Sequence, residues 1–177
     1  MHVLDLGGTV QTWSAAPVTP ASVTIVNLQP QPPAPGSTVT SIVGDVCSLP
    51  SAVVARSFDL VFSNSVIEHV GGHAKRMEMA SSVRSLAPHH WVQTPYRYFP
   101  IEPHMLFPGF QFLPPVAQVQ VARRWPFAWA QPTGRAAVGV ALEVELLTRT
   151  QMTFYFPSSR LLTERFGGLP KSLIAMA

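Results

Sequence analysis

Residues 2–9 read HVLDLGGT, an apolar segment of strand length that ends at Gly7 and Gly8. Glycine lets the backbone turn sharply and approach a ligand closely, because it has no Cβ. Asp5 comes just before the turn, so its carboxylate is expected at the carboxyl end of a first strand, where an open parallel sheet binds its ligands. The stretch predicts the opening of an α/β nucleotide-binding fold, although ordinary tight turns also use two glycines.

Three further apolar runs of strand length follow, at residues 23–28, 39–46 and 58–65. Each ends in polar residues, namely Asn27, Asp45, Ser63 and Asn64. Near-continuous apolar strands are typical of a parallel sheet that is buried on both faces. Since the carboxyl ends of parallel strands share one edge, these side chains and Asp5 are expected to form a binding rim along that edge.

The segments VLDLGGT, VTIVNL, GDVCSLP and FDLVFSNSVIEHVGG, in this order and spacing, resemble the motifs of class I S-adenosylmethionine-dependent methyltransferases. The stretches WVQTPYRYFPIEPHMLFPGFQFLP and ERFGGLPKSLIAMA are similar to a bacterial branch of that family, so the resemblance covers residues 2–177. It implies a Rossmann-like α/β fold with a mostly parallel seven-stranded sheet, completed by a C-terminal antiparallel hairpin. It also implies S-adenosylmethionine as the cofactor and methyl transfer as the activity.

The same resemblance implies a set of cofactor-binding residues at the strand ends: Asp5, Gly7, Gly8, Thr9, Asn27, Leu28, Asp45, Val46, Ser63 and Asn64. In the family, the glycine motif cradles the methionine part of the cofactor, and the end of the second strand holds the ribose hydroxyls. The acidic motif after the third strand contacts adenine. The end of the fourth strand lies beside the reacting methyl group.

Two features depart from the family pattern. Thr9 and Gln11 stand where the first motif usually has further glycines, and Asn27 replaces the acid that holds the ribose. An amide can still bond a hydroxyl but carries no charge. Both departures favour weaker cofactor binding, so the alternative function is a degenerate, non-catalytic protein of this fold that serves in association.

The candidates for removing a proton from the methyl acceptor are His69, His73, Glu102 and His104. His69 directly follows the fourth strand, where the family places residues that face the acceptor; orienting the adjacent helix is the alternative role. Glu102 and His104 form a Glu-Pro-His sequence and could act together as a base, or ligate a metal with a carboxylate elsewhere. One histidine and one glutamate do not make a ligand set, so no metal site is predicted. Glu68 is expected to point outward.

The length of 177 residues fits a single domain over residues 1–177, which is expected to lack the helices that usually precede the first strand in the family. The proline-rich linker at 29–37 cannot be helical, so one side of the sheet should carry fewer helices. Helices are expected from residue 73 to a stop at Pro88, and at 138–152. The segment 95–115, rich in proline and aromatic residues, is expected to be irregular and to form the acceptor wall, or a loop that closes the core.

Composition limits the partners. Hydrophobic residues make up 47% and charged residues 12%, which predicts apolar surface covered by an apolar substrate or by a second copy in a homodimer. The formal charge of +3 is too small and scattered for nucleic acid, which favours a small-molecule, lipid or sugar acceptor, with O-methylation preferred. The single Cys47 fits a reducing, cytoplasmic location, and no stretch predicts a membrane span or a signal peptide.

Overall fold

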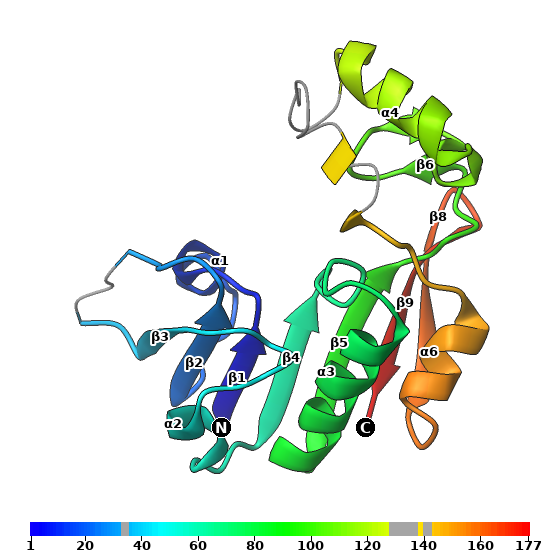
Figure 1. Ribbon diagram of the computed structural model, residues 1–177. Coiled ribbons are helices and arrows are strands. Elements are labelled where there is room, and N and C mark those ends of the chain that lie inside the picture. Colours follow the sequence, from blue (N-terminus) through cyan, green and yellow to red (C-terminus); the bar gives the residue numbers. More distant parts are fainter. Residues whose placement is uncertain (33–35, 128–137, 140–142) are drawn as a thin grey trace.

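The computed structural model describes residues 1–32, 36–127, 138–139 and 143–177. At its centre lies a seven-stranded sheet with the strand order β3-β2-β1-β4-β5-β9-β8 (Figure 1). Its strands are β1 (His2–Leu6), β2 (Ser22–Asn27), β3 (Val39–Val43), β4 (Leu60–Asn64), β5 (His89–Pro95), β8 (Arg160–Phe166) and β9 (Leu169–Met176). The first five strands run parallel, whereas β9 runs antiparallel to both β5 and β8. The predicted mostly parallel sheet with its C-terminal hairpin is confirmed.

The two faces of the sheet are covered unequally. Three helices pack on one face: α2 (Ser51–Val54), α3 (His73–Leu86) and α6 (Arg149–Tyr155). They bury Leu4 and Leu6 of β1 completely. On the opposite face, near β1 and β2, the short helix α1 (Val10–Ser14) packs on Val3 and Val23. Among the described residues, no other helix contributes to this apolar cluster. The described residues between β2 and β3 contain no helix, so the predicted reduction of helices on one side is confirmed.

Of the predicted helix over 138–152, residues 140–142 lie outside the described part of the chain, and the prediction is wrong across residues 144–148, which are not helical. The amide of Glu145 donates to the carbonyl of Glu68 at 3.0 Å, and Leu147 forms a parallel bridge with β5's neighbour Tyr96. These bonds to other segments replace helical ones, while Leu147 stays fully buried. Apolar residues at helical spacing therefore lie in extended chain here. Hydrogen bonds to distant segments, and not the local spacing, decide between helix and extended conformation.

The segment that follows β5 stands above the carboxyl ends of the strands (Figure 1). It contains β6 (Ile101–Glu102), β7 (Phe107–Pro108), η1 (Phe110–Phe112) and α4 (Pro115–Arg124). Met105, Phe110 and Ala122 form its own small core. The expectation of an irregular segment is therefore wrong in part, since local apolar packing supports these short elements.

None of the described helices has the length and apolar character needed to cross a membrane.

Candidate functional site

The turn after β1 has no space for side chains at either glycine. Gly7 adopts a φ of +85°, and a Cβ at this position would lie 2.5 Å from Cγ2 of Val66. A Cβ at Gly8 would lie only 1.7 Å from Oδ2 of Asp5. The turn is thus bare backbone that packs tightly on Val66 and on the Asp5 carboxylate.

Asp5 lies beneath this turn and is almost completely buried, with 1% of its surface exposed. Trp13 of α1 donates its indole N–H to Oδ2 at 2.6 Å, whereas Oδ1 has no hydrogen-bond partner among the described residues. Burial raises the pKa of Asp5 to about 6, and the bond from Trp13 offsets only part of this rise. The strand end therefore holds a buried acid that is only half satisfied by the protein.

This raised pKa predicts a specific pH dependence of stability. The native state binds the Asp5 proton more tightly than the unfolded chain, so the stabilisation is complete below about pH 4 and is lost as the pH rises through about 6. Relative to the wild type, Asp5→Asn should therefore gain up to about 3 kcal/mol of unfolding free energy between these limits. Denaturant unfolding of both proteins at stepped pH measures the difference, and parallel pH profiles would contradict the assignment.

Asn27 closes the glycine turn from the side of β2. Its Nδ2 donates to the carbonyl of Gly7 at 3.2 Å and to that of Gly8 at 3.0 Å. Its Oδ1 accepts from the amide of Gln29 at 3.0 Å. Both donors of the amide are therefore used to hold the turn, and only Oδ1 has a lone pair left for a hydroxyl.

The predicted residues after β3 and at the end of β4 differ in exposure. Asp45 is exposed, and its Oδ1 accepts from the amide of Cys47 at 2.8 Å. Val46 is buried in the main core. Ser63 is fully buried and donates to the carbonyl of Leu6 at 3.2 Å. The structure thus gives Ser63 a contact that joins β4 to β1, which the sequence did not indicate.

Three other predicted cofactor residues lie on the surface near the same edge. Thr9 accepts a hydrogen bond from the amide of Thr12 at 3.2 Å and caps α1. Leu28 is 69% exposed just beyond β2. Asn64 is exposed at the end of β4 and lines a cavity of about 680 Å³. The strand-end residues are therefore gathered at one edge, as expected for parallel strands.

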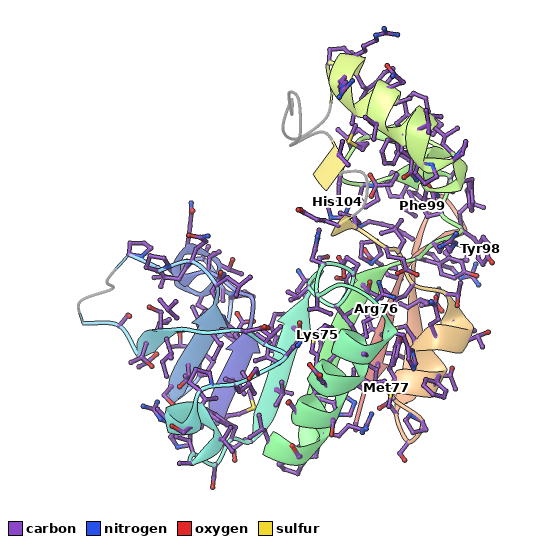
Figure 2. The ribbon with its side chains drawn as sticks, in the orientation of Figure 1. Lys75, Arg76, Met77, Tyr98, Phe99 and His104 are labelled. Carbon is purple, nitrogen blue, oxygen red and sulfur yellow. The ribbon has the colours of Figure 1, made fainter. Side chains whose placement is uncertain are left out.

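The loop after β4 begins with a strained residue. Ser65 has a φ of +55°, which is uncommon for a residue with a side chain. Two bonds to β5 hold it there: its amide donates to the carbonyl of Gln93 at 3.0 Å, and its Oγ donates to the Gln93 side chain at 2.8 Å. His69, four residues further on, contacts His104, which Figure 2 shows in the segment above the sheet.

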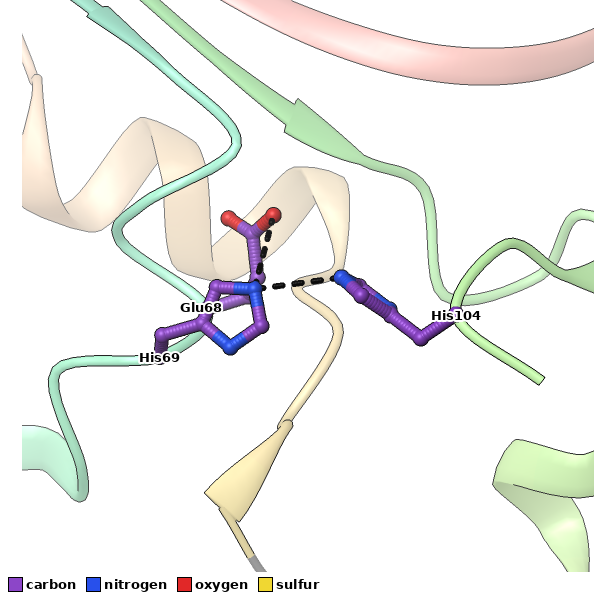
Figure 3. A group of neighbouring side chains, drawn as sticks. All are labelled: Glu68, His69 and His104. Carbon is purple, nitrogen blue, oxygen red and sulfur yellow. Dashed lines mark hydrogen bonds and ion pairs between the residues drawn. The ribbon is translucent and has the colours of Figure 1, made fainter. Parts of the chain in front are cut away.

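Glu68 points inward, so the expectation that it faces solvent is wrong. The residue is fully buried, and its Oε2 accepts from Oγ1 of Thr94 at 2.9 Å. Its Oε1 has no hydrogen-bond partner within the part of the chain that the structure describes, and lies 3.9 Å from Nε2 of His69 (Figure 3). Burial raises the pKa of Glu68 to about 7. Its neighbour Ile67 is buried as well, so this turn packs against the core.

The predicted catalytic residues come together from two distant segments. Nε2 of His69 lies 3.1 Å from Nε2 of His104, and the two rings meet edge to face (Figure 3). Nδ1 of His104 lies 2.6 Å from Oε1 of the buried Glu102, whose other oxygen accepts from the Met105 amide at 2.6 Å. His73 lies apart, with Nδ1 3.1 Å from the hydroxyl of Tyr155.

The two histidines differ in their proton affinity. Burial lowers the pKa of His69, and the charge of His104 lowers it further. Burial also acts to lower the pKa of His104, but the Glu102 carboxylate at its Nδ1 outweighs this effect and raises it. At neutral pH, His69 is therefore a neutral imidazole beside an imidazole that a carboxylate orients.

No protein-family model and no curated protein matches the chain. Solved structures match nearly all of it. The methyltransferase domain of bacterial CtHen1 is 12% identical, with 99% of this chain and 88% of that chain covered and a TM-score of 0.57. The N-methyltransferase NodS from Bradyrhizobium japonicum WM9, in complex with S-adenosyl-L-homocysteine, is 13% identical, with 99% and 76% covered and a TM-score of 0.53.

A third match is a protein from Rhodobacter sphaeroides that is provisionally assigned as a Zn-dependent alcohol dehydrogenase. It is 12% identical, with 99% of this chain and 82% of that chain covered and a TM-score of 0.62. At such identities the likeness concerns the fold alone. The strand order, the reversed β9 and the glycine turn after β1 all agree with the family implied by the sequence motifs. The chain has the Rossmann-like fold of class I S-adenosylmethionine-dependent methyltransferases.

Proposed function

We propose that the chain is an S-adenosylmethionine-dependent methyltransferase that binds its cofactor along the carboxyl edge of β1, β2 and β4. The observation that carries this proposal is the turn at Gly7 and Gly8, where bare backbone lies over the buried and half-paired Asp5. A cationic ligand at this edge would favour the ionised form of that acid. The structural match to NodS in complex with S-adenosyl-L-homocysteine supports the same cofactor.

Several residues at the edge fit such a ligand. Oδ1 of Asn27 retains a lone pair for a ribose hydroxyl, and the exposed Asp45 carboxylate stands beyond β3. Thr9, Leu28 and Asn64 are accessible around them. We assign Val46 to the apolar wall and Ser63 to the support of the edge, since Ser63 joins β4 to β1.

When bound, S-adenosylmethionine supplies a methyl group on a sulfonium that leaves as a neutral thioether. The protein then has to align the acceptor and take its proton. We assign proton removal to His69, because its lowered pKa keeps the imidazole neutral at neutral pH, and a neutral imidazole has one ring nitrogen that can accept a proton. His104 and Glu102 form a hydrogen-bonded pair that orients the His69 ring.

We infer a small-molecule, lipid or sugar acceptor rather than nucleic acid, with O-methylation preferred. The cavity of about 680 Å³ that reaches Asn64 has Trp91, Phe99 and Phe166 in its walls, a size and character that suit a small ligand with an apolar part. Exposed apolar residues near this cavity, such as Leu106, would also serve a homodimer. We place the reaction in a single domain acting in the cytoplasm, where the lone Cys47 stays reduced.

Calorimetric titration with S-adenosylmethionine and S-adenosyl-L-homocysteine tests the proposal. We expect saturable binding, and Asp45→Ala should weaken it at least about tenfold through the loss of a hydrogen bond to a charged acceptor. Asp59→Ala is the matched control, because Asp59 is an exposed carboxylate at the opposite, amino end of the strands, bonded to the His2 amide. This control should keep the wild-type affinity.

Two results would contradict the proposal. No heat and no thermal shift at millimolar ligand would favour the degenerate, non-catalytic alternative. That alternative is supported by Asn27, whose two N–H donors are both used within the protein and are not available to a ribose. Equal affinities for Asp45→Ala and the wild type would show that adenine lies elsewhere on the edge.

A further inference from the structure

We propose that Glu68, His69 and His104 form a site for one divalent transition-metal ion beside the proposed methyl-donor site. Each residue offers one ligand atom: Oε1 of the glutamate and Nε2 of each histidine. These three atoms lie within 4.8 Å of one another. They come from the loop after β4 and from the segment above the sheet, which meet at this point (Figure 3).

The spacing suits a common ion. Two atoms that each lie about 2.1 Å from the same metal are separated by about 3.0 Å at a right angle and by at most about 4.2 Å. The two Nε2 atoms are 3.1 Å apart, and Oε1 of Glu68 is 3.9 Å from Nε2 of His69. A small closure of the His104 side chain toward Glu68 would bring the third pair into the same range. Both histidine side chains are partly exposed, which allows this movement.

A hydrogen bond between His69 and His104 would explain why the two rings are close, but it would not explain the unpaired buried oxygen of Glu68. Oε1 is fully shielded from solvent and has no hydrogen-bond partner among the described residues, although it points toward His69. An unpaired carboxylate oxygen in such surroundings is strongly unfavourable, and a bound cation satisfies it. Meanwhile Thr94 donates to Oε2 at 2.9 Å, the kind of outer contact that orients a ligating carboxylate.

Glu102 completes the arrangement on the other side. Histidines that ligate a metal usually donate the other ring N–H to a carboxylate or carbonyl, which fixes the tautomer. Nδ1 of His104 lies 2.6 Å from Oε1 of Glu102, and the Met105 amide holds the second carboxylate oxygen at 2.6 Å. The lone pair on Nε2 of His104 is therefore directed at His69 and the site. Glu102 acts here as a positioning residue.

The ligand set indicates the kind of ion. Two imidazoles and one carboxylate suit Mn²⁺, Fe²⁺, Co²⁺ or Zn²⁺ better than Mg²⁺ or Ca²⁺, which prefer oxygen ligands. Three protein ligands leave at least one coordination position open, as in catalytic rather than structural sites. The side chains of His69 and His104 are 39% and 29% exposed, so water or an acceptor hydroxyl can reach that position.

The use of the ion in methyl transfer rests on the proposed function, whereas the site itself does not. An acceptor hydroxyl that coordinates the ion loses its proton to water more readily. Its oxygen then forms the bond to the methyl carbon, while the electron pair of the breaking sulfur–carbon bond stays on sulfur. In this form of the reaction water would accept the proton, and His69 would serve with His104 as a ligand of the ion instead of acting as the base.

Titration of the chelator-treated, tag-free protein with Co²⁺ tests the site, because bound Co²⁺ develops a visible absorption that reports imidazole ligands. We expect one Co²⁺ per chain, and excess Mg²⁺ should not displace it. The double variant His69→Ala/His104→Ala should weaken binding more than about 100-fold, and Glu102→Gln should weaken it about 10- to 100-fold. His89→Ala, an exposed histidine at the amino end of β5, is the control and should bind as the wild type does.

The proposal is overturned if the wild type develops no Co²⁺ absorption, or if the double variant binds with the wild-type affinity. Circular dichroism shows whether each variant is folded, and the partly exposed positions of both histidines make this outcome expected. Cofactor binding is measured separately by calorimetry without Co²⁺. Absence of S-adenosylmethionine binding with intact Co²⁺ binding would therefore reject the proposed function alone, and the reverse result would reject the metal site alone.

Discussion

Replacing Gly8 by alanine is expected to lower the free energy of unfolding by about 3 kcal/mol and to remove measurable S-adenosylmethionine binding. The new Cβ would lie 1.7 Å from Oδ2 of Asp5, far inside contact distance. Relief requires either a shift of the turn or rotation of the Asp5 carboxylate, which would break its 2.6 Å bond from Trp13. The first movement displaces the backbone that is proposed to cradle the cofactor, and the second changes the carboxylate that lies beneath it. Urea denaturation and calorimetry measure the two effects.

A double-mutant cycle identifies the cause of this loss. In an Asp5→Ala background the carboxylate is gone, so Gly8→Ala should cost less than about 1 kcal/mol, and the two changes should be strongly non-additive. Gly36→Ala serves as a second comparison, because Gly36 has a φ of +77° and no described atom within 4 Å of its missing Cβ, so this change reports backbone strain without a clash. An equal loss from Gly8→Ala with and without Asp5 would refute the steric explanation.

The strand pattern was predictable because burial on both faces leaves nearly continuous apolar runs that end where the sheet ends. The helix predicted over 138–152 was wrong at residues 144–148 for a related reason. Val144 and Leu147 have the spacing of a helix. However, Leu147 forms a bridge with Tyr96, and the amide of Glu145 donates to the carbonyl of Glu68. Such pairing joins residues that are far apart in the chain, and local spacing carries no information about it.

In the candidate site, too, the sequence indicated local motifs but not the contacts between distant residues. The sequence placed His69 and His104 in two separate motifs, and the structure brings their Nε2 atoms to 3.1 Å. It expected Glu68 to face solvent, and it predicted no metal site because one histidine and one glutamate, His104 and Glu102, do not make a ligand set. The proposed set of three ligands could not be recognised from the sequence, because it includes Glu68, which was expected to point outward. The inward-facing Glu68 is held by contacts with Thr94 and with the amide of Glu145, both distant in the sequence, so the residues around it do not indicate its direction.

Replacing Arg76 by alanine should destabilise the protein by about 3 kcal/mol, through lost packing and lost hydrogen bonds. Arg76 lies on α3, and only 1% of its surface is exposed (Figure 2). Its Nη2 lies 2.8 Å from Oε2 of Glu145, and its Nε donates to the carbonyl of Ile67 at 3.4 Å. Lys75→Ala is the matched control, since the adjacent Lys75 forms only an exposed pair with Glu78 and should change stability by less than about 0.5 kcal/mol.

Arg76 also positions the loop that carries the candidate ligands. It bonds the carbonyl of Ile67, while its partner Glu145 donates its amide to the carbonyl of Glu68 at 3.0 Å. Arg76→Met keeps most of the buried volume but loses the side-chain bonds of Arg76 to Ile67 and Glu145, so it should recover much of the stability that alanine loses. Amide hydrogen exchange in residues 66–70 should nevertheless stay faster than in the wild type. If methionine restored slow exchange in this loop, Arg76 would contribute packing alone, and the position of Glu68 would have to depend on Thr94 and the β4 turn instead.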